Sequence, residues 1–180
     1  MIRTAMSPED FAAFGEVVTA YFGWCRERYA HDAWLVDQVF GHQSFAAELA
    51  DLSTAYAAPN GRTLLAFDED GQVCGGGAYR RLPDGSCEMK RLYVHDRCRG
   101  QGVGRKLCTA LLETARADGY TLMRLDTGNL LREAIAMYTS FGFAHAPPHH
   151  EYPEELMPYL VFMERALNDA PLAPSGTASG

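Results

Sequence analysis

Several kinds of segment are absent from this 180-residue chain, and each absence excludes a class of protein. No run approaches the ~18 consecutive apolar residues that a membrane-spanning helix needs. Met1–Met6 leads directly into Ser7-Pro8-Glu9-Asp10, without the apolar region of a secretory signal. No cluster of lysine and arginine occurs and the formal net charge is −7, which disfavours nucleic acid as a partner. We therefore expect neither a membrane nor a nucleic acid among the partners of this protein.

The chain also lacks the cysteine patterns of metal-binding and disulfide-rich proteins. Its five cysteines are Cys25, Cys74, Cys87, Cys98 and Cys108. None of them forms a Cys-x-x-Cys pair, and an odd number leaves one unpaired if the others are bridged. Reduced thiols are the simpler interpretation, and they predict a cytoplasmic location.

The length and composition favour one globular domain. Hydrophobic residues make up 47% of the chain, and a chain of this size can bury a core without a metal or disulfides. We expect a single domain over residues 1–167. Residues 168–180 are rich in Ala, Pro, Ser and Gly, and this composition predicts a disordered tail.

A glycine-rich segment, Arg99–Gly104, is the most informative feature of the sequence. It follows a strand-like run at Cys87–Val94 and opens a helix-like run at Arg105–Ala117. Alternate glycines leave backbone N–H groups uncovered, and the helix start adds further unpaired N–H groups and a positive dipole end. This combination predicts a phosphate or pyrophosphate site built from main chain.

Two familiar phosphate-binding loops do not fit this segment. A nucleoside-triphosphate loop needs Gly, four residues, then Gly-Lys-Ser/Thr, and no such run exists. A dinucleotide fingerprint would need glycine where the chain has Arg105 or Leu107. The pattern Arg/Gln-x-x-Gly-x-Gly/Ala fits without a gap.

Local signals predict an alternation of helices and strands. Ser7 is a good N-cap and Pro8 suits the first helical position. The predicted helices are Pro8–Arg28, Gln43–Leu52, Arg105–Asp118 and Leu130–Phe141. The predicted strands are Thr63–Phe67, Val73–Arg80, Cys87–Val94, Leu122–Asp126 and Tyr159–Glu164.

Three blocks, Cys87–Val94, Arg99–Gly104 and Ala134–Phe143, together resemble the GNAT superfamily of acetyl-CoA-dependent N-acetyltransferases. The resemblance covers roughly residues 60 to 165. It implies an α/β fold with a mixed sheet, in which the central fourth and fifth strands splay apart. Coenzyme A would enter the opening as acetyl-CoA with its pyrophosphate on the glycine-rich loop, and a homodimer is plausible.

The resemblance also implies the cofactor-binding residues. Backbone groups of Leu92, Tyr93 and Val94 would bind the pantetheine and polarise the thioester carbonyl. The expected pyrophosphate loop comprises Arg99, Gly100, Gln101, Gly102, Val103, Gly104 and Arg105. Many members carry an asparagine where this chain has Leu131, so Asn129 is the expected substitute.

Two residues are candidates for the chemistry. An alkyl amine with a pKa near ~10 must lose a proton before it attacks, and the departing thiolate must be stabilised. Glu88 is the candidate base: strand alternation would place it on one face with Lys90 and Leu92, and some members carry a carboxylate at the matching position. Tyr138 matches the position where the family often places a tyrosine near the CoA sulfur.

A histidine-rich loop is the remaining polar feature. His145, His149 and His150 lie near Glu151, but no further ligand is evident in the sequence. A polar loop that shapes the acceptor pocket is favoured over a metal site.

The predicted function is transfer of acetyl from acetyl-CoA to a primary amine of a small molecule by direct attack. A protein or peptide N-acetyltransferase and a non-catalytic acyl-CoA-binding sensor remain alternatives.

Overall fold

The computed structural model describes residues 1–168, so the predicted tail lies, apart from Asn168, outside the described residues. Seven strands form one mixed sheet in the order β1-β2-β3-β4-β5-β7-β6. Their bounds are β1 Ile2–Thr4, β2 Gly61–Phe67, β3 Val73–Arg81, β4 Cys87–Val94, β5 Leu122–Gly128, β6 Ala144–His145 and β7 Leu160–Ala166. The sheet and its helices confirm the predicted α/β fold.

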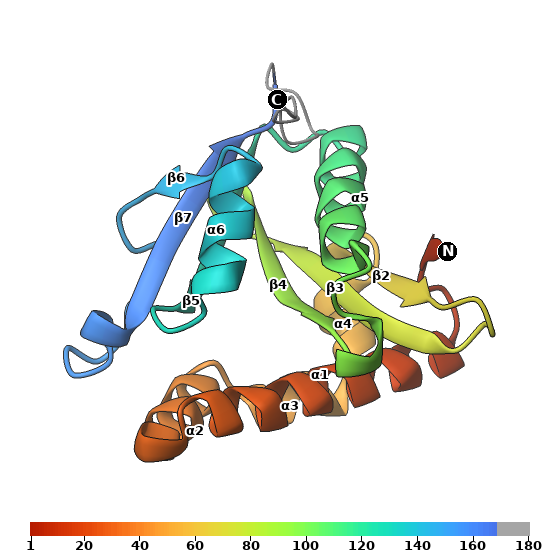
Figure 1. Ribbon diagram of the computed structural model, residues 1–180. Helices are drawn as coiled ribbons and strands as arrows, with labels where there is room; N and C mark the ends of the chain where they lie inside the picture. The colour runs from red at the N-terminus through yellow and green to blue at the C-terminus, as the bar shows by residue number, and fades with distance from the viewer. Residues whose placement is uncertain (169–180) are drawn as a thin grey trace, which may run out of the picture.

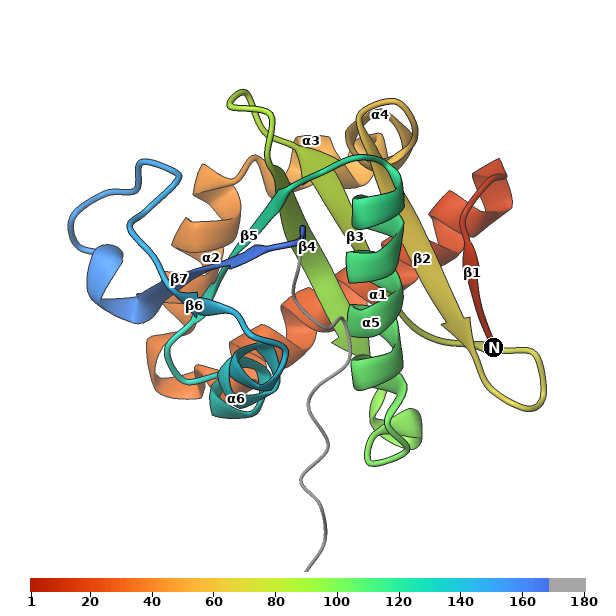
Figure 2. The same ribbon diagram turned by 90° about the horizontal axis from the view of Figure 1, so that it is seen from above.

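Helices cover both faces of this sheet (Figures 1 and 2). The α-helices are α1 Pro8–Arg28, α2 Ala33–His42, α3 Phe45–Ala50, α4 Leu52–Tyr56, α5 Val103–Ala117 and α6 Arg132–Ser140. Short 3₁₀ turns occupy Ala30–Asp32, Asp96–Cys98 and Met157–Tyr159. α1 and α4 pack against β2 and β3 on one face, whereas α5 packs against β2, β3 and β4 on the other. None of the helices within residues 1–168 is both long and apolar enough to cross a membrane.

The long helix α1 has the bounds that its sequence predicts. The Ser7 side chain accepts from the Asp10 N–H, and Asp10 accepts in return from the backbone of Ser7. This reciprocal arrangement satisfies N–H groups that a helix start leaves unpaired. The ion pair of Asp10 with Arg3, 2.6 Å between Oδ1 and Nη2, ties the start of α1 to β1.

The two central strands β4 and β5 diverge after a short contact. They pair in parallel only at Cys87 with Met123 and at Glu88 with Arg124. Beyond this point the two strands separate, as Figures 1 and 2 show. The splayed strands that the family resemblance implies are therefore confirmed, and the opening positions the site.

A β-bulge in β4 changes the expected side-chain alternation. Gly76 pairs with Tyr93 and Ala78 with Lys90, so two residues of β4 lie opposite Gly77. Arg91, one of these two, has a φ of 59°. A Cβ on Gly77 would lie 2.9 Å from both the Leu92 and the Leu111 side chains, so these two leucines pack closely against the glycine. The bulge therefore turns Leu92 toward α5, and the prediction that Glu88 and Leu92 share a face is wrong.

Candidate active site

The glycine-rich loop presents its backbone N–H groups at the start of α5. Gly100 and Gly102 have φ values of 76° and 74°, a conformation that favours glycine. Within the described residues, none of the N–H groups from Gly100 to Arg105 donates to a backbone carbonyl. These unpaired donors and the helix dipole give the loop the geometry that anion binding requires, and binding of a pyrophosphate there stays a prediction.

A groove runs from this loop between α1, β4 and α6. Its lining includes the predicted Leu92, Tyr93, Val94, Arg99 and Gly104. The Arg99 guanidinium lies over the Trp24 ring, 4.8 Å from its centroid, and over the Tyr93 ring at 5.3 Å. Arg99 also donates to the Val94 carbonyl, so it packs along the groove as well as flanking the loop.

A second cavity, of about 80 Å³, lies between the splayed strands and the helices α1 and α2. Apolar and aromatic side chains dominate its lining, among them Tyr21, Tyr29, Val36, Val39, Phe40 and Tyr159. The cavity and the groove share five lining residues, which are Tyr21, Leu92, Thr127, Leu131 and Tyr138. The groove and the cavity therefore meet at these five residues.

Tyr138 lies at this junction, on α6. The residue is 8% exposed, and its ring packs edge-on against Phe143 at 5.7 Å. Burial, with Cys108 and Asp126 nearby, raises the pKa of the Tyr138 phenol well above its usual value. The phenol is therefore protonated at any working pH and can act as a hydrogen-bond donor.

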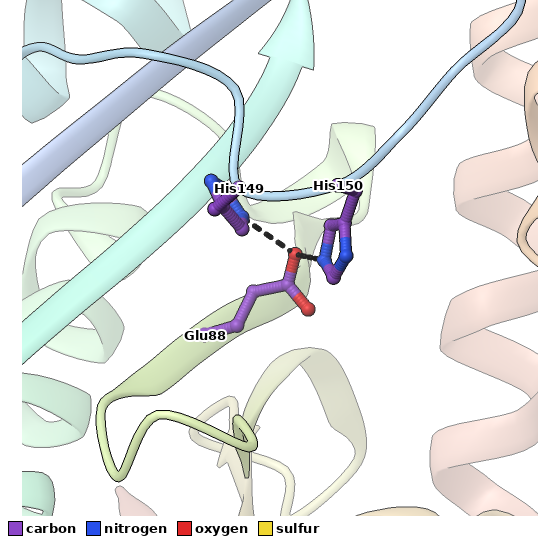
Figure 3. A group of neighbouring side chains, drawn as sticks. All are labelled: Glu88, His149 and His150. Carbon is purple, nitrogen blue, oxygen red and sulfur yellow. Dashed lines mark hydrogen bonds and ion pairs between the residues drawn. The ribbon is translucent and has the colours of Figure 1, made fainter.

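Glu88 does not line the cavity or the groove. Its carboxylate is fully buried and accepts from Arg80 Nε at 2.9 Å, while His149 and His150 approach its other oxygen (Figure 3). Burial by itself would raise the pKa of Glu88, but Lys90, the histidines and Arg80 outweigh it and hold the pKa far below its usual range. With its carboxylate held in this way Glu88 is not in contact with the cavity, and its role as the base stays a prediction.

The carboxylate that does line the cavity belongs to Asp126 on β5. Lys90 Nζ lies 2.9 Å from one oxygen of Asp126. The other oxygen accepts from Gln43 Nε2 and from the Tyr152 hydroxyl, each at 3.1 Å. Lys90 and Asp126 are each only 5% exposed at the side chain, so this polar cluster lies at the inner end of a mostly apolar cavity.

Asn129 does not lie where the sequence analysis expects it. Its amide donates to the Pro158 carbonyl at 3.1 Å, and its oxygen accepts from the Tyr29 hydroxyl at 3.4 Å. The residue is not part of the groove lining, whereas Leu131 is. The side chain of Asn129 thus joins Tyr29, which follows α1, to the segment before β7, and a contact of Asn129 with the cofactor stays a prediction.

The sequence analysis missed Asp126, Gln43 and Tyr152. A signal for Asp126 was available, because alternation along β5 buries Met123 and Leu125 on the core side and turns Asp126 to the opposite face. Gln43 follows α2, whose position depends on packing against α1, and no local pattern indicates it.

A family model described as "Acetyltransferase (GNAT) family" matches residues 16–143. The chain belongs to this family. An uncharacterized N-acetyltransferase of Schizosaccharomyces pombe is 37% identical over 122 residues, which is 67% of this chain and 73% of the relative. An Escherichia coli protein, also named an uncharacterized N-acetyltransferase, is 34% identical over 100 residues, 54% of this chain and 59% of the relative.

Solved structures agree with this assignment. A Klebsiella pneumoniae protein described as an acyl-CoA N-acyltransferase has a TM-score of 0.69 and 29% identity, covering 93% of this chain and 97% of its own. An Escherichia coli GNAT-family N-acetyltransferase solved in complex with CoA has a TM-score of 0.59 and 22% identity, covering 93% and 81%. Family and relatives support an acyl-CoA-dependent N-acetyltransferase.

Proposed function

We propose that the protein transfers acetyl from acetyl-CoA to a primary amine of a small molecule, which attacks the thioester directly. The supporting observation is that the groove and the cavity meet at Tyr138. The cavity of about 80 Å³ has room for a handful of water-sized groups, at roughly 10–15 Å³ each. A cavity of this size, covered by α1 and α2, favours a small acceptor over a folded protein.

The cofactor would lie in the groove with its pyrophosphate on the N–H groups of Gln101–Arg105. Its pantetheine would follow the edge of β4 at Leu92–Val94, where β4 no longer pairs with β5. Main-chain groups that are unpaired in a splayed sheet can hydrogen-bond an extended chain.

We assign the contact with the acceptor amine to Asp126. An alkyl amine with a pKa of ~10 is protonated when it binds at neutral pH. A buried carboxylate can bind this ammonium group and then accept its proton, directly or through water. Lys90, Gln43 and Tyr152 fix the orientation of this carboxylate. Tyr138 would donate a hydrogen bond to the thiolate that leaves; full proton transfer is uphill, because a thiol has a pKa near ~8.5.

The test is acetyl-CoA turnover on a panel of small amines, amino acids and peptides, followed by thiol release, with acetyl-CoA binding measured by calorimetry. We expect turnover on one class of small amines. Asp126→Asn should lower kcat/KM by roughly 10²-fold or more and leave acetyl-CoA binding unchanged. Turnover on peptides alone would overturn the small-molecule assignment, and turnover that survives Asp126→Asn would overturn the assigned base.

A further inference from the structure

The side chains of Glu88, His149 and His150 converge at a place that the proposed reaction does not use (Figure 3). Glu88 Oε1 lies 3.0 Å from His149 Nε2 and 2.7 Å from His150 Nε2. One potential ligand atom from each residue lies within 4.8 Å of the other two. We propose that these three residues bind a divalent transition-metal ion, with Zn²⁺ as the best match.

The spacing of the three atoms suits such an ion. Zinc lies about 2.0–2.2 Å from histidine nitrogen and carboxylate oxygen, so the ligand atoms of a tetrahedral site are roughly 3.3 Å apart. The two oxygen–nitrogen separations here are 3.0 Å and 2.7 Å. Small side-chain rotations would open both separations to the roughly 3.3 Å between the ligand atoms of a tetrahedral site. Two imidazoles with one carboxylate are a ligand set that zinc accepts.

The burial of the cluster also suits a metal site. The side chain of Glu88 is fully buried and that of His149 is 3% exposed, whereas that of His150 is 27% exposed. A pocket lined by His149, His150, Arg124 and Leu82 adjoins the cluster. Water or a small anion can reach the fourth coordination position from this side.

Two cationic side chains near Glu88 determine the electrostatic cost of binding a metal ion there. Arg80 binds the second carboxylate oxygen, Oε2, at 2.9 Å, which leaves Oε1 for the metal and orients the carboxylate as an outer-shell partner does. Lys90 Nζ is 3.5 Å from Oε1, but its nearer partner is Asp126 at 2.9 Å. Asp126 offsets the charge of Lys90, and Glu88 itself offsets that of Arg80, so a metal ion on Oε1 would bind beside both cations and binding must overcome this repulsion.

Metal binding changes the hydrogen bonding of the imidazoles. Nε2 of each ring would give its lone pair to the metal, so the ring proton moves to Nδ1. Nδ1 of His149 is buried and has no hydrogen-bond partner within residues 1–168.

The site would fasten one loop to the sheet. His149 and His150 belong to the segment between β6 and β7, and Glu88 belongs to β4. The same loop carries Tyr152, which reaches Asp126 at the cavity. A bound metal would therefore hold in place the loop whose Tyr152 hydrogen-bonds Asp126.

The test uses the full chain without a polyhistidine tag, freed of metal with a chelator. Zn²⁺ is titrated by calorimetry, and Co²⁺ is titrated by its visible absorption, which reports tetrahedral coordination. We expect one Zn²⁺ per chain and a rise in Tm that grows with Zn²⁺ concentration. Glu88→Gln and His150→Ala should each weaken binding by more than the roughly 10- to 100-fold that loss of an outer-shell partner causes.

His145→Ala is the matched control, because this histidine is close in sequence and is not part of the cluster. His150→Ala is the safer ligand variant because its side chain is partly exposed, and circular dichroism verifies that it folds. The absence of stoichiometric Zn²⁺ binding to the wild-type chain would overturn the proposal. So would binding that persists in both ligand variants, since it would then come from other residues such as the cysteines.

Discussion

The Tyr152 hydroxyl donates to the Asp126 carboxylate across 3.1 Å and thereby links the loop between β6 and β7 to the inner end of the acceptor cavity. The same hydroxyl lies 2.6 Å from Gln43 Nε2, at the end of α2. Three separate parts of the chain thus meet at one carboxylate. The orientation of Asp126 depends on a loop and a helix that lie far from β5 in sequence.

Removal of this hydroxyl should affect the acceptor more than the cofactor. Tyr152→Phe keeps the ring packing against Phe162 but deletes one of the donors to Asp126. We expect a several-fold rise in KM for the amine and little change in acetyl-CoA affinity. Steady-state kinetics with each substrate varied in turn provides the measurement. Tyr159→Phe is the matched control, because Tyr159 lines the cavity and is not among the hydrogen-bond partners of Asp126 within residues 1–168. Equal effects of both variants would contradict a specific role for Tyr152.

Much of the fold could be predicted from local sequence signals, and the exceptions have physical causes. Ser7 and Pro8 mark the start of α1 within a few residues, because helix capping is a local interaction. The helix α2 is ambiguous in sequence because its aromatic residues are buried by tertiary packing, as in the contact of Phe40 with Tyr21. The bulge at Arg91 places a non-glycine residue at positive φ. The run Gly75–Gly77 in the neighbouring strand β3 indicates a bulge or a close backbone approach in this region, but no pattern indicates that Arg91 has the positive φ.

The candidate site divides in the same way. Short sequence motifs predict the glycine-rich loop and Tyr138. Both lie at the groove or at its junction with the cavity. Glu88 and His149 are 61 residues apart, and only the folded sheet brings them together. The sequence offers a role for each residue separately, but the spacing between them does not predict that their side chains meet.

Loss of the Tyr138 hydroxyl should slow turnover. Tyr138→Phe should lower kcat by about 10²-fold, the usual scale for one group that assists a proton transfer, with acetyl-CoA binding preserved. Pre-steady-state thiol release and calorimetry measure the two quantities separately. Tyr29→Phe serves as the comparison, because Tyr29 also lines the cavity and its hydroxyl donates to Asn129. Unchanged turnover in Tyr138→Phe would remove this residue from the mechanism.

The glycine-rich loop provides a test of cofactor binding. Gly102→Glu places a carboxylate next to the N–H groups of the anion site and a side chain at a φ of 74°, so acetyl-CoA binding should be abolished. The matched variant is Gly71→Glu, since Gly71 has the same φ of 74° in the hairpin between β2 and β3. Backbone strain is then similar in both proteins, and only Gly102→Glu should lose binding in calorimetry. Retained affinity in Gly102→Glu would refute the loop assignment.

The start of α1 should give a pH-dependent contribution to stability. The Arg3 guanidinium and the Met6 N–H hold the pKa of Asp10 below its usual 3.8. Because the folded-state pKa lies below the unfolded one, the stabilisation is present above about pH 4 and is lost as the pH falls through the folded-state value. Asp10→Asn should therefore lower the free energy of unfolding by about 1 kcal/mol at pH 7, with the difference from wild type closing at low pH. Urea unfolding at a series of pH values measures this, with Glu9→Gln as the control in the same helical turn. If the difference in unfolding free energy between wild type and Asp10→Asn stayed constant down to the lowest pH, the charge of Asp10 would not be its source.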